Sequence, residues 1–460
     1  MAFEIPDGLM VSVSGVRGRV GQALTPDVAM RFAAAFGAYM TDRAGGRARI
    51  VVGRDSRTSG PLLVRAVSAA LEGVGCDVVD VGLVPTPTAL MAIRHHGATG
   101  GVVVTASHNP VEWNALKLAS AQGMFLDAEE AAALRAHLDA PPPWAAWDGV
   151  GGVEHDEGAV ERHLRAILDL PYVDVDALRE RRFTVALDCI RGAGARTLPP
   201  LLEALGCRVH GINLEPDGRF PRAPEPVAAN LGELAALVRE TGADVGFATD
   251  PDADRLSLLD ERGTPLGEDY TLALAVRLVL RHERGAVVTN LSTSRVVEDA
   301  ALDGGARFHR AAVGEINVAR RMQQEKAVIG GEGNGGVILP ALHYTRDAQV
   351  AAALMLQLLL ETGSTPAELV GSHRRYTIVK SSVARPPGGL ESTYERLEAA
   401  LTPPVTDRQD GLWLAWPQQR RWLHVRPSGT EPIVRMIAEA DDDTAAQQLV
   451  DDARRALQVN

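Results

Sequence analysis

The chain has 460 residues, a net charge of −12 and 46% hydrophobic residues, which together describe a globular protein of two to four domains. This composition excludes disorder of the whole chain and collagen-like repeats, and the acidic balance disfavours a nucleic-acid partner. The three cysteines form no C-x-x-C pair, and residues 1–10 lack the basic start of a secretory signal. Since no uncharged apolar run reaches ~18 residues, we expect a cytoplasmic protein without a membrane partner.

Strands and helices are predicted to alternate along most of the chain. Short Val- and Ile-rich runs are followed by Gly- or Asp-containing turns and then by Ala-, Leu- and Arg-rich stretches with helical spacing. The pattern predicts strands at 50–53, 76–81, 101–104, 183–188, 208–212, 286–290 and 326–329. It predicts helices at 62–73, 86–96 and 195–205, and a third strand–helix round that starts at Val245 and runs through Tyr270 to His282. This alternation is typical of a mostly parallel sheet with helices on both faces.

The pattern changes near the C-terminus. Antiparallel strands are predicted at 376–384, 411–417 and 421–426, with a helix inside 385–410 and a closing amphipathic helix at 442–457. Strands and helices in this order indicate an α+β unit. We therefore predict an α/β protein with three similar mixed, mostly parallel α/β domains, possible divergent copies of one module, and a smaller α+β domain, at 1–150, 151–257, 258–368 and 369–460.

Ser107 follows the predicted strand at 101–104, in the segment Thr105-Ala106-Ser107-His108-Asn109-Pro110. A serine exposed on such a turn is a candidate nucleophile, and the adjacent His108 is a candidate base or phosphate ligand. The alternative is an N-cap, in which Ser107 or Asn109 opens a helix at Pro110. The segment alone favours neither interpretation.

Asp250, Asp252 and Asp254 occupy alternate positions of one loop after a predicted strand. Their negative charges would repel one another unless a cation lies among them. Oxygen-only ligands favour a hard ion, and Mg²⁺ is preferred where phosphate is the substrate. We interpret the loop as a metal site, with a solvated acidic loop as the alternative.

Two further loops have ligand-binding composition. The stretch 330–336 places five glycines around Glu332 and Asn334, so a ligand can approach the backbone closely and meet side chains suited to sugar hydroxyls. The stretch 426–432, with Arg435 beyond it, combines hydroxyls, backbone N–H groups and arginines into a cradle for an anion such as phosphate. The alternatives are a flexible turn and a hydroxyl-rich turn. The smaller segments 14–18 and 53–57 are either functional or plain surface turns.

Together these segments resemble the α-D-phosphohexomutase family. The resemblance covers essentially the whole chain and rests on SGVRG at 14–18, TASHNP at 105–110, DPDADR at 250–255, GEGNGG at 331–336 and RPSGTEP at 426–432. It implies four domains around one deep central cleft. The segments 313–318, 331–336 and 346–348 look most similar to phosphoglucosamine mutases of the archaeal type, with phosphomannomutase/phosphoglucomutase as the alternative.

The resemblance also implies a chemistry. Ser107 would carry a phosphate in the resting enzyme, and Mg²⁺ would bind this phosphate together with Asp250, Asp252 and Asp254. The phosphate would pass to a hexose 6- or 1-phosphate to give a hexose 1,6-bisphosphate, which turns over and returns its other phosphate to Ser107. The implied substrate-binding residues are Glu332 and Asn334 for sugar hydroxyls, Arg426, Ser428, Gly429, Thr430 and Arg435 for the non-reacting phosphate, and Arg255.

Proton transfer is assigned to Lys117, with a pKa lowered by burial or by Arg17, and His108 and His343 are the alternatives. The histidine that many relatives carry in the sugar loop is absent, because that loop reads Asn-Gly-Gly at 334–336. We expect glucosamine phosphate as substrate, and a non-catalytic sugar-phosphate sensor is disfavoured by the intact nucleophile and metal loops. The expected assembly is a monomer or a homodimer.

Overall fold

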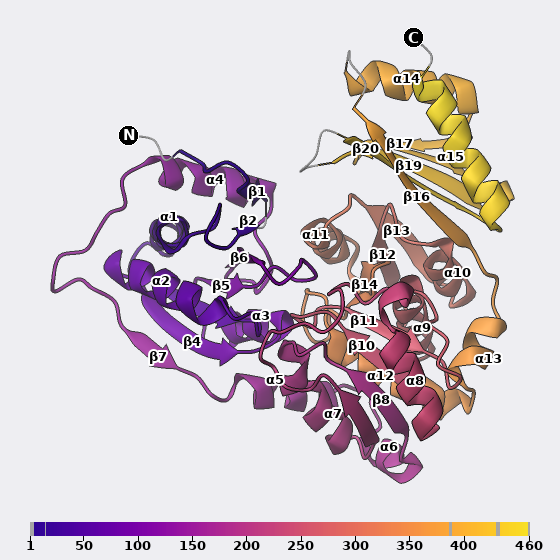
Figure 1. The fold of residues 1–460 in the computed structure, drawn as a ribbon, viewed down its shortest axis with the longest axis horizontal. Helices are drawn as coiled ribbons and strands as arrows, with labels where there is room; N and C mark the ends of the chain where they lie inside the picture. The colour runs from indigo at the N-terminus through magenta and orange to yellow at the C-terminus, as the bar shows by residue number, and fades with distance from the viewer. Residues whose placement is uncertain (1–3, 14, 386–388, 429–432, 459–460) are drawn as a thin grey trace.

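The computed structural model describes residues 4–13, 15–385, 389–428 and 433–458. Within this part, the chain forms four sheets, one of seven strands, two of four and one of five. Figure 1 shows the seven-stranded sheet on the left, the five-stranded sheet at the upper right and the two four-stranded sheets below it on the right. Each of the first three sheets packs against buried apolar clusters on both faces. The predicted α/β class is confirmed.

The first sheet has the strand order β1-β2-β6-β5-β3-β4-β7. Its strands are β1 (Met10–Ser12), β2 (Gly15–Arg19), β3 (Arg49–Arg54), β4 (Asp77–Leu83), β5 (Gly100–Val104), β6 (Trp113–Ser120) and β7 (Val153–His155). The accompanying helices are α1 (Pro26–Ala44), α2 (Gly60–Gly73), α3 (Thr86–His95), α4 (Ala128–Asp139) and α5 (Ala159–Leu168). Strands β3, β4, β5 and β7 are parallel, whereas β6 runs antiparallel to β5.

The second and third sheets are β11-β10-β8-β9 and β13-β12-β14-β15. Their strands are β8 (Thr184–Asp188), β9 (Arg208–Ile212), β10 (Val245–Thr249), β11 (Leu256–Leu259), β12 (Ala286–Asn290), β13 (Arg307–Ala311), β14 (Ala327–Glu332) and β15 (Gly336–Ile338). Their helices are α6 (Val175–Arg181), α7 (Leu198–Ala204), α8 (Gly232–Thr241), α9 (Glu268–His282), α10 (Arg295–Asp303), α11 (Glu315–Glu325), α12 (Ala348–Thr362) and α13 (Pro366–Gly371).

The assignment of Val245 to a third strand–helix round is wrong. Strand β10 pairs in parallel with β8 and antiparallel with β11, so it belongs to the second sheet, and the third sheet begins with β12. The predicted domain boundary between 257 and 258 falls inside β11. Local periodicity does not show which neighbour a strand will pair with, and that pairing decides the sheet.

One four-strand plan recurs in the first three sheets. Three parallel strands are followed by an antiparallel one, in the orders β4-β3-β5-β6, β9-β8-β10-β11 and β13-β12-β14-β15. The recurrence supports three copies of one module. In each copy, the turn between the third and fourth strand holds a predicted functional loop, at 105–112, 250–255 and 333–335. These turns lie at the carboxyl ends of parallel strands, where open α/β sheets bind their ligands.

The C-terminal sheet is antiparallel throughout, in the order β16-β20-β19-β18-β17. Its elements are β16 (Thr377–Ala384), α14 (Leu390–Leu401), β17 (Val405–Asp407), β18 (Leu412–Trp416), β19 (Arg421–Pro427), β20 (Ile433–Ala440) and α15 (Asp443–Gln458). The three predicted strands and both predicted helices are present. Strand β20 was missed, because the sequence around Arg435 was interpreted as part of an anion loop.

Helix α12 lies in the core shared by the second and third sheets. Its residues 348–359 are all buried, and they join one apolar cluster that spans the second and third sheets. A helix that is apolar on all sides is stable only when it is surrounded. The first and fourth sheets have cores of their own. In the described part of the chain, no helix combines the length and the apolar character that crossing a membrane requires.

Candidate active site

Ser107 lies in the turn between β5 and β6. Its backbone has a φ of 49°, in the left-handed region that residues other than glycine rarely occupy. The Ser107 hydroxyl donates to Asp250 Oδ2 at 2.9 Å, and His108 Nδ1 lies 3.3 Å from the same hydroxyl oxygen. The alternative in which Ser107 or Asn109 caps a helix is wrong, because the chain continues into strand β6. The turn thus presents the Ser107 oxygen to the acidic loop of the second sheet.

Arg57 holds this turn in place. It is fully buried, and its guanidinium donates to the carbonyl oxygens of Ser107 and Asn109 at 2.6 Å, Pro110 at 2.7 Å and Trp113 at 2.9 Å. Asp55 Oδ2 accepts from Arg57 Nε at 3.1 Å. Bonds from a charged donor are the stronger kind. The sequence marks the segment 53–57 but does not indicate this role of Arg57, because the partners lie far along the chain.

Asp250, Asp252 and Asp254 converge in the turn between β10 and β11. All three are buried, and one carboxylate oxygen from each lies within 4.8 Å of the others. Within the described chain, Oδ1 of Asp252 and Oδ1 of Asp254 are buried without a hydrogen-bond partner. An unpartnered buried carboxylate oxygen is costly, and several of them together suit a hard divalent cation. The residues present therefore fit a metal ion.

The second carboxylate oxygen of Asp252 and that of Asp254 both accept hydrogen bonds. Asp252 Oδ2 accepts from Thr86 Oγ1 at 2.7 Å and from Lys117 Nζ at 2.8 Å. Asp254 Oδ2 accepts from Arg346 Nη2 at 2.6 Å. Thr86 and Arg346 were not predicted as site residues. Arg346 stands in a segment used for the family resemblance, which is a weak signal, whereas nothing in the sequence near Thr86 indicates its contact.

The crowded charges change the protonation of the site. Burial, and then the charges of Asp254 and Asp252, raise the pKa of Asp250 well above its ordinary value. Burial alone would raise the pKa of Asp252, but Lys117 lowers it overall. Burial alone would lower the pKa of Lys117, but Asp252 and Asp254 raise it overall. The expected lowering of the Lys117 pKa is therefore wrong, because the lysine is paired with two carboxylates.

The other residues predicted for proton transfer lie beside this cluster. Arg17 and Lys117 occupy neighbouring strands, β2 and β6, and Arg17 Nη1 donates to Asn109 Oδ1 at 2.6 Å. Burial lowers the pKa of Arg17. Burial, and then the charges of Arg255 and Arg17, lower the pKa of His108 to about 2. The His108 ring is therefore neutral at physiological pH and is a weak base.

Glu332 and Asn334 lie at the end of β14 and in the loop after it. Glu332 Oε1 accepts from Asn290 Nδ2 at 2.8 Å, and Oε2 accepts from Arg346 Nη1 at 2.8 Å. Burial alone would raise the pKa of Glu332, but Arg346 and Asn290 lower it overall. Asn334 Oδ1 is buried without a hydrogen-bond partner among the residues described. Through Arg346, the sugar loop is joined to Asp254 of the metal loop.

Arg255 closes the metal loop. It is mostly buried, and its guanidinium lies 3.6 Å from Glu225 Oε1 and 3.7 Å from Asp254 Oδ1. The charge of Arg255 also lowers the pKa of His108 in the Ser107 turn. Residues from the first three sheets therefore form one charged network at the junction of their functional loops.

The predicted phosphate residues belong to the hairpin β19–β20. Arg426 and Arg435 are directly opposite each other in the two strands, where like charges repel. Asp410 Oδ1 accepts from Arg426 Nε at 3.2 Å, and an anionic ligand would relieve the repulsion further. Ser428 follows β19. Three predicted residues lie outside the part that the structure describes, Ser14, Gly429 and Thr430.

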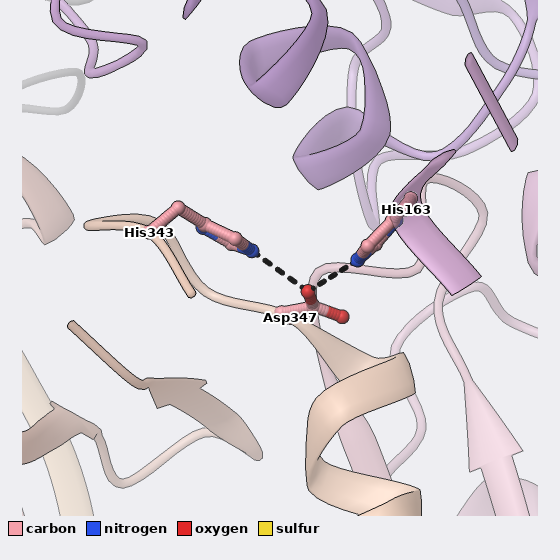
Figure 2. Close-up of side chains that lie close together, drawn as sticks. All are labelled: His163, His343 and Asp347. Atoms are coloured by element: carbon pink, nitrogen blue, oxygen red, sulfur yellow. Dashed lines mark hydrogen bonds and ion pairs between the residues drawn. The ribbon is translucent and has the colours of Figure 1, made fainter. Parts of the chain in front are cut away.

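A second cluster of metal-ligating residue types joins α3, α5 and the start of α12. Figure 2 shows His163 and His343 pointing at Asp347 from two sides, each with Nε2 at 2.8 Å from Oδ2. His163 Nδ1 lies 2.8 Å from Thr88 Oγ1, and His343 Nδ1 accepts from the backbone N–H of Thr345. Asp347 Oδ1 accepts two N–H bonds from the first turn of α12.

Every polar atom of these three side chains therefore has a hydrogen-bond partner, whereas the metal loop contains buried carboxylate oxygens without one. The three residues thus form a hydrogen-bonded junction. Burial alone would raise the pKa of Asp347, but His163 and His343 lower it overall. His343, an alternative for proton transfer, has both ring nitrogens engaged in this junction and is buried away from such a role.

Models of the four phosphoglucomutase/phosphomannomutase domains match this chain in order. The alpha/beta/alpha domains I, II and III match residues 9–142, 161–263 and 267–376, and the C-terminal domain matches 405–456. A probable phosphoglucosamine mutase of Methanopyrus kandleri is 38% identical over 97% of both chains. A phosphoglucomutase/phosphomannomutase of Thermococcus kodakarensis is 37% identical over 96% of this chain and 97% of its own.

Among solved structures, a phosphoglucomutase/phosphomannomutase family protein from Burkholderia thailandensis superimposes with a TM-score of 0.84 at 27% identity, covering 98% of this chain and 97% of its own. Fold and site thus define a four-domain phosphohexomutase, an enzyme of intramolecular phosphoryl transfer. The chain belongs to the phosphoglucomutase/phosphomannomutase family, and the family resemblance of the sequence is confirmed.

Proposed function

We propose that this enzyme interconverts hexose 6-phosphate and hexose 1-phosphate through a phosphoserine at Ser107 and a hexose 1,6-bisphosphate. The observation that carries the proposal is the 2.9 Å hydrogen bond from Ser107 Oγ to Asp250 Oδ2, beside two more buried carboxylates that each have one oxygen without a hydrogen bond within the described chain. A nucleophilic oxygen next to a cation site is the arrangement that phosphoryl transfer uses.

The chain's residues divide the reaction between them. In the first half-reaction, a sugar hydroxyl oxygen attacks the phosphorus on Ser107, and the bond from phosphorus to Ser107 Oγ breaks. In the second, Ser107 Oγ attacks the phosphorus of the other phosphate, and the sugar oxygen that carried this phosphate leaves. The attacking sugar hydroxyl loses a proton in the first half-reaction, and the leaving sugar oxygen gains one in the second, so the protons balance. We assign that proton transfer to Lys117. Asp250, Asp252 and Asp254 would hold Mg²⁺, which when bound neutralises phosphoryl charge and offsets the negative charge around Lys117.

Glucosamine phosphate is the sugar phosphate that we propose as preferred substrate. Support comes from the 38% identical relative called a probable phosphoglucosamine mutase. The 37% identical phosphoglucomutase/phosphomannomutase makes mannose or glucose phosphate the second candidate. Measuring kcat/KM side by side on glucosamine-, mannose- and glucose-6-phosphate decides between them, and a higher value for either of the last two would contradict our choice.

The phosphoserine is tested by intact-mass analysis together with Ser107→Ala. Purified wild type should carry one phosphate that is lost on incubation with a hexose phosphate. Ser107→Ala should lack it, and its turnover should fall by at least ~10³, as for a lost nucleophile. Ser56→Ala is the matched control, since Ser56 is a buried serine of the same domain. Near-native turnover of Ser107→Ala, with contaminating enzyme excluded, would end the phosphoserine mechanism.

A further inference from the structure

Thr86 joins the first module to the metal loop of the second. It is the first residue of α3 and is completely buried. Its hydroxyl donates to Asp252 Oδ2 at 2.7 Å, and its backbone N–H donates to the carbonyl oxygen of Asp252 at 3.0 Å. One residue of the Ser107-bearing module thus contacts both the side chain and the backbone of a proposed metal ligand.

The two oxygens of Asp252 have different surroundings. Oδ2 accepts from the Thr86 hydroxyl and from Lys117 Nζ, whereas Oδ1 is buried and unpartnered within the described chain. A partial rotation of the carboxylate about its Cβ–Cγ bond would lengthen both bonds at Oδ2. The Thr86 hydroxyl therefore helps to hold the carboxylate plane in the orientation that leaves one oxygen for a cation.

Asp254 shows the same division. Its Oδ2 is held by Arg346 at 2.6 Å, whereas its Oδ1 accepts no hydrogen bond in the part of the chain described and has the Arg255 guanidinium 3.7 Å away. The repetition at two neighbouring ligands indicates a site whose carboxylates are oriented before an ion arrives. Groups that hydrogen-bond to metal ligands typically contribute about 10- to 100-fold to metal affinity.

We propose that Thr86 is a positioning residue for the metal site, which orients Asp252 so that its Oδ1 faces the cation. Thr86 would act through Asp252, with which its hydroxyl and backbone N–H form hydrogen bonds, and not as a ligand itself. The inference rests on the proposed function, because it takes Asp250, Asp252 and Asp254 as the metal ligands. It goes further in assigning part of the metal affinity to a residue of the module that carries the nucleophile.

Thr86→Val removes the hydroxyl and leaves the net charge of the protein unchanged. The Kd for Mn²⁺, measured directly on the full chain without substrate by electron paramagnetic resonance, should rise about 10-fold or more. Thr86→Ser keeps a hydroxyl and should restore most of the affinity. Titration with Mg²⁺ in competition with Mn²⁺ should give the same order of variants.

Thr88→Val is the matched control. Thr88 is buried in the same helix, two residues further on, and its hydroxyl contacts His163 in place of the metal loop. This variant should lose stability in thermal unfolding but keep the wild-type Kd for Mn²⁺. A purely structural role for Thr86 would instead make the two valine variants alike in both measurements.

The outcomes separate the two proposals. If wild type does not bind Mn²⁺ or Mg²⁺, the proposed metal site fails, and the role of Thr86 fails with it. If wild type binds and folded Thr86→Val binds equally well, only the role of Thr86 is overturned. Should Thr86→Val not fold, Thr86→Cys decides, since its weak S–H donor should also raise the Kd, and wild-type affinity there would overturn the inference.

Discussion

A serine in the left-handed backbone region needs neighbours that hold it there. Ser107 has a φ of 49°, and such a conformation costs on the order of 1–3 kcal/mol. Arg57 offsets this cost with bonds to the carbonyl oxygens of the same turn, each worth about 1.5–3 kcal/mol for a charged donor. Arg57 therefore keeps the Ser107 hydroxyl directed at Asp250, although Arg57 itself binds the backbone carbonyl oxygens of the turn.

Arg57→Lys keeps the charge but replaces a planar fork of donors by one ammonium, which cannot reach the same set of carbonyl oxygens. We expect kcat to fall about 10- to 100-fold, equivalent to one lost charged hydrogen bond, with KM for the sugar phosphate changed much less. Arg54→Lys is the control, because Arg54 lies in the same segment and donates to the backbone oxygen of Asp55. Steady-state kinetics check this, and equal kcat values for the two variants would contradict it.

The residues of the motifs were predictable from the sequence, whereas the residues that support them were not. Three aspartates within five positions indicate a cation through their mutual repulsion alone. Thr86, Arg57 and Arg346 instead act on partners 166, 50 and 92 residues away. A single sequence contains no local signal for such pairs, because only the folded chain brings them together.

Strands β20 and β6 were difficult to predict from the sequence, each for a different reason. Strand β20 alternates buried and more exposed residues over its first half, as an amphipathic strand does, but its Arg435 drew it into the predicted anion loop. Strand β6 is almost wholly buried, so it has no alternation, and its pairing with β5 and β2 decides its structure. In both cases, long-range pairing supplies what local periodicity lacks.

Strand β20 also attaches the C-terminal sheet to the third module. Glu439 of β20 is completely buried against the start of α10. Its carboxylate accepts hydrogen bonds from Ser294 Oγ, from the backbone N–H of Arg295 and from Trp422 Nε1. Burial raises the pKa of Glu439 to about 7. The charged groups that face it from the third module are Arg310 on β13 and Asp269 on α9, and Asp269 accepts from the backbone N–H of Ser294.

This contact should make stability depend on pH. An unfolded glutamate has a pKa of about 4.3, so between this value and about 7 the folded protein retains a proton on Glu439 that the unfolded chain releases. The stabilisation is complete below the lower value and is lost as pH rises through the upper one. Between pH 5 and 7.5, the free energy of unfolding of wild type should fall by about 2 kcal/mol more than that of Glu439→Gln. Urea unfolding at several pH values measures this, and parallel curves would argue against it.

The four units of the molecule are not equally joined. The second and third share one core built on α12, whereas the C-terminal sheet has its own core. It meets the third module through a small cluster of Leu291, Trp413, Ala415 and Trp422 and through the stretch 363–374, part of which is helix α13. Because the C-terminal sheet keeps a core of its own and meets the third module through a small apolar cluster and individual polar contacts such as those of Glu439, we predict that the C-terminal domain rotates as one body, with its hinge in that stretch, to carry a phosphate between its hairpin and the Ser107 side.

A rotating domain that holds a bisphosphate in two orientations must recognise phosphate charge and not the sugar. Arg435→Ala should therefore raise KM by a similar factor for every accepted sugar phosphate, about 10- to 100-fold for a lost charged hydrogen bond. Asn334→Ala should instead change the ratio of kcat/KM between glucosamine-6-phosphate and glucose-6-phosphate. Arg421→Ala is the control within the same hairpin, since its guanidinium lies over the Trp416 ring. If Arg435→Ala discriminated between the sugars while Asn334→Ala did not, the two loops would have the opposite roles, with the third module binding the phosphate and the mobile domain selecting the sugar.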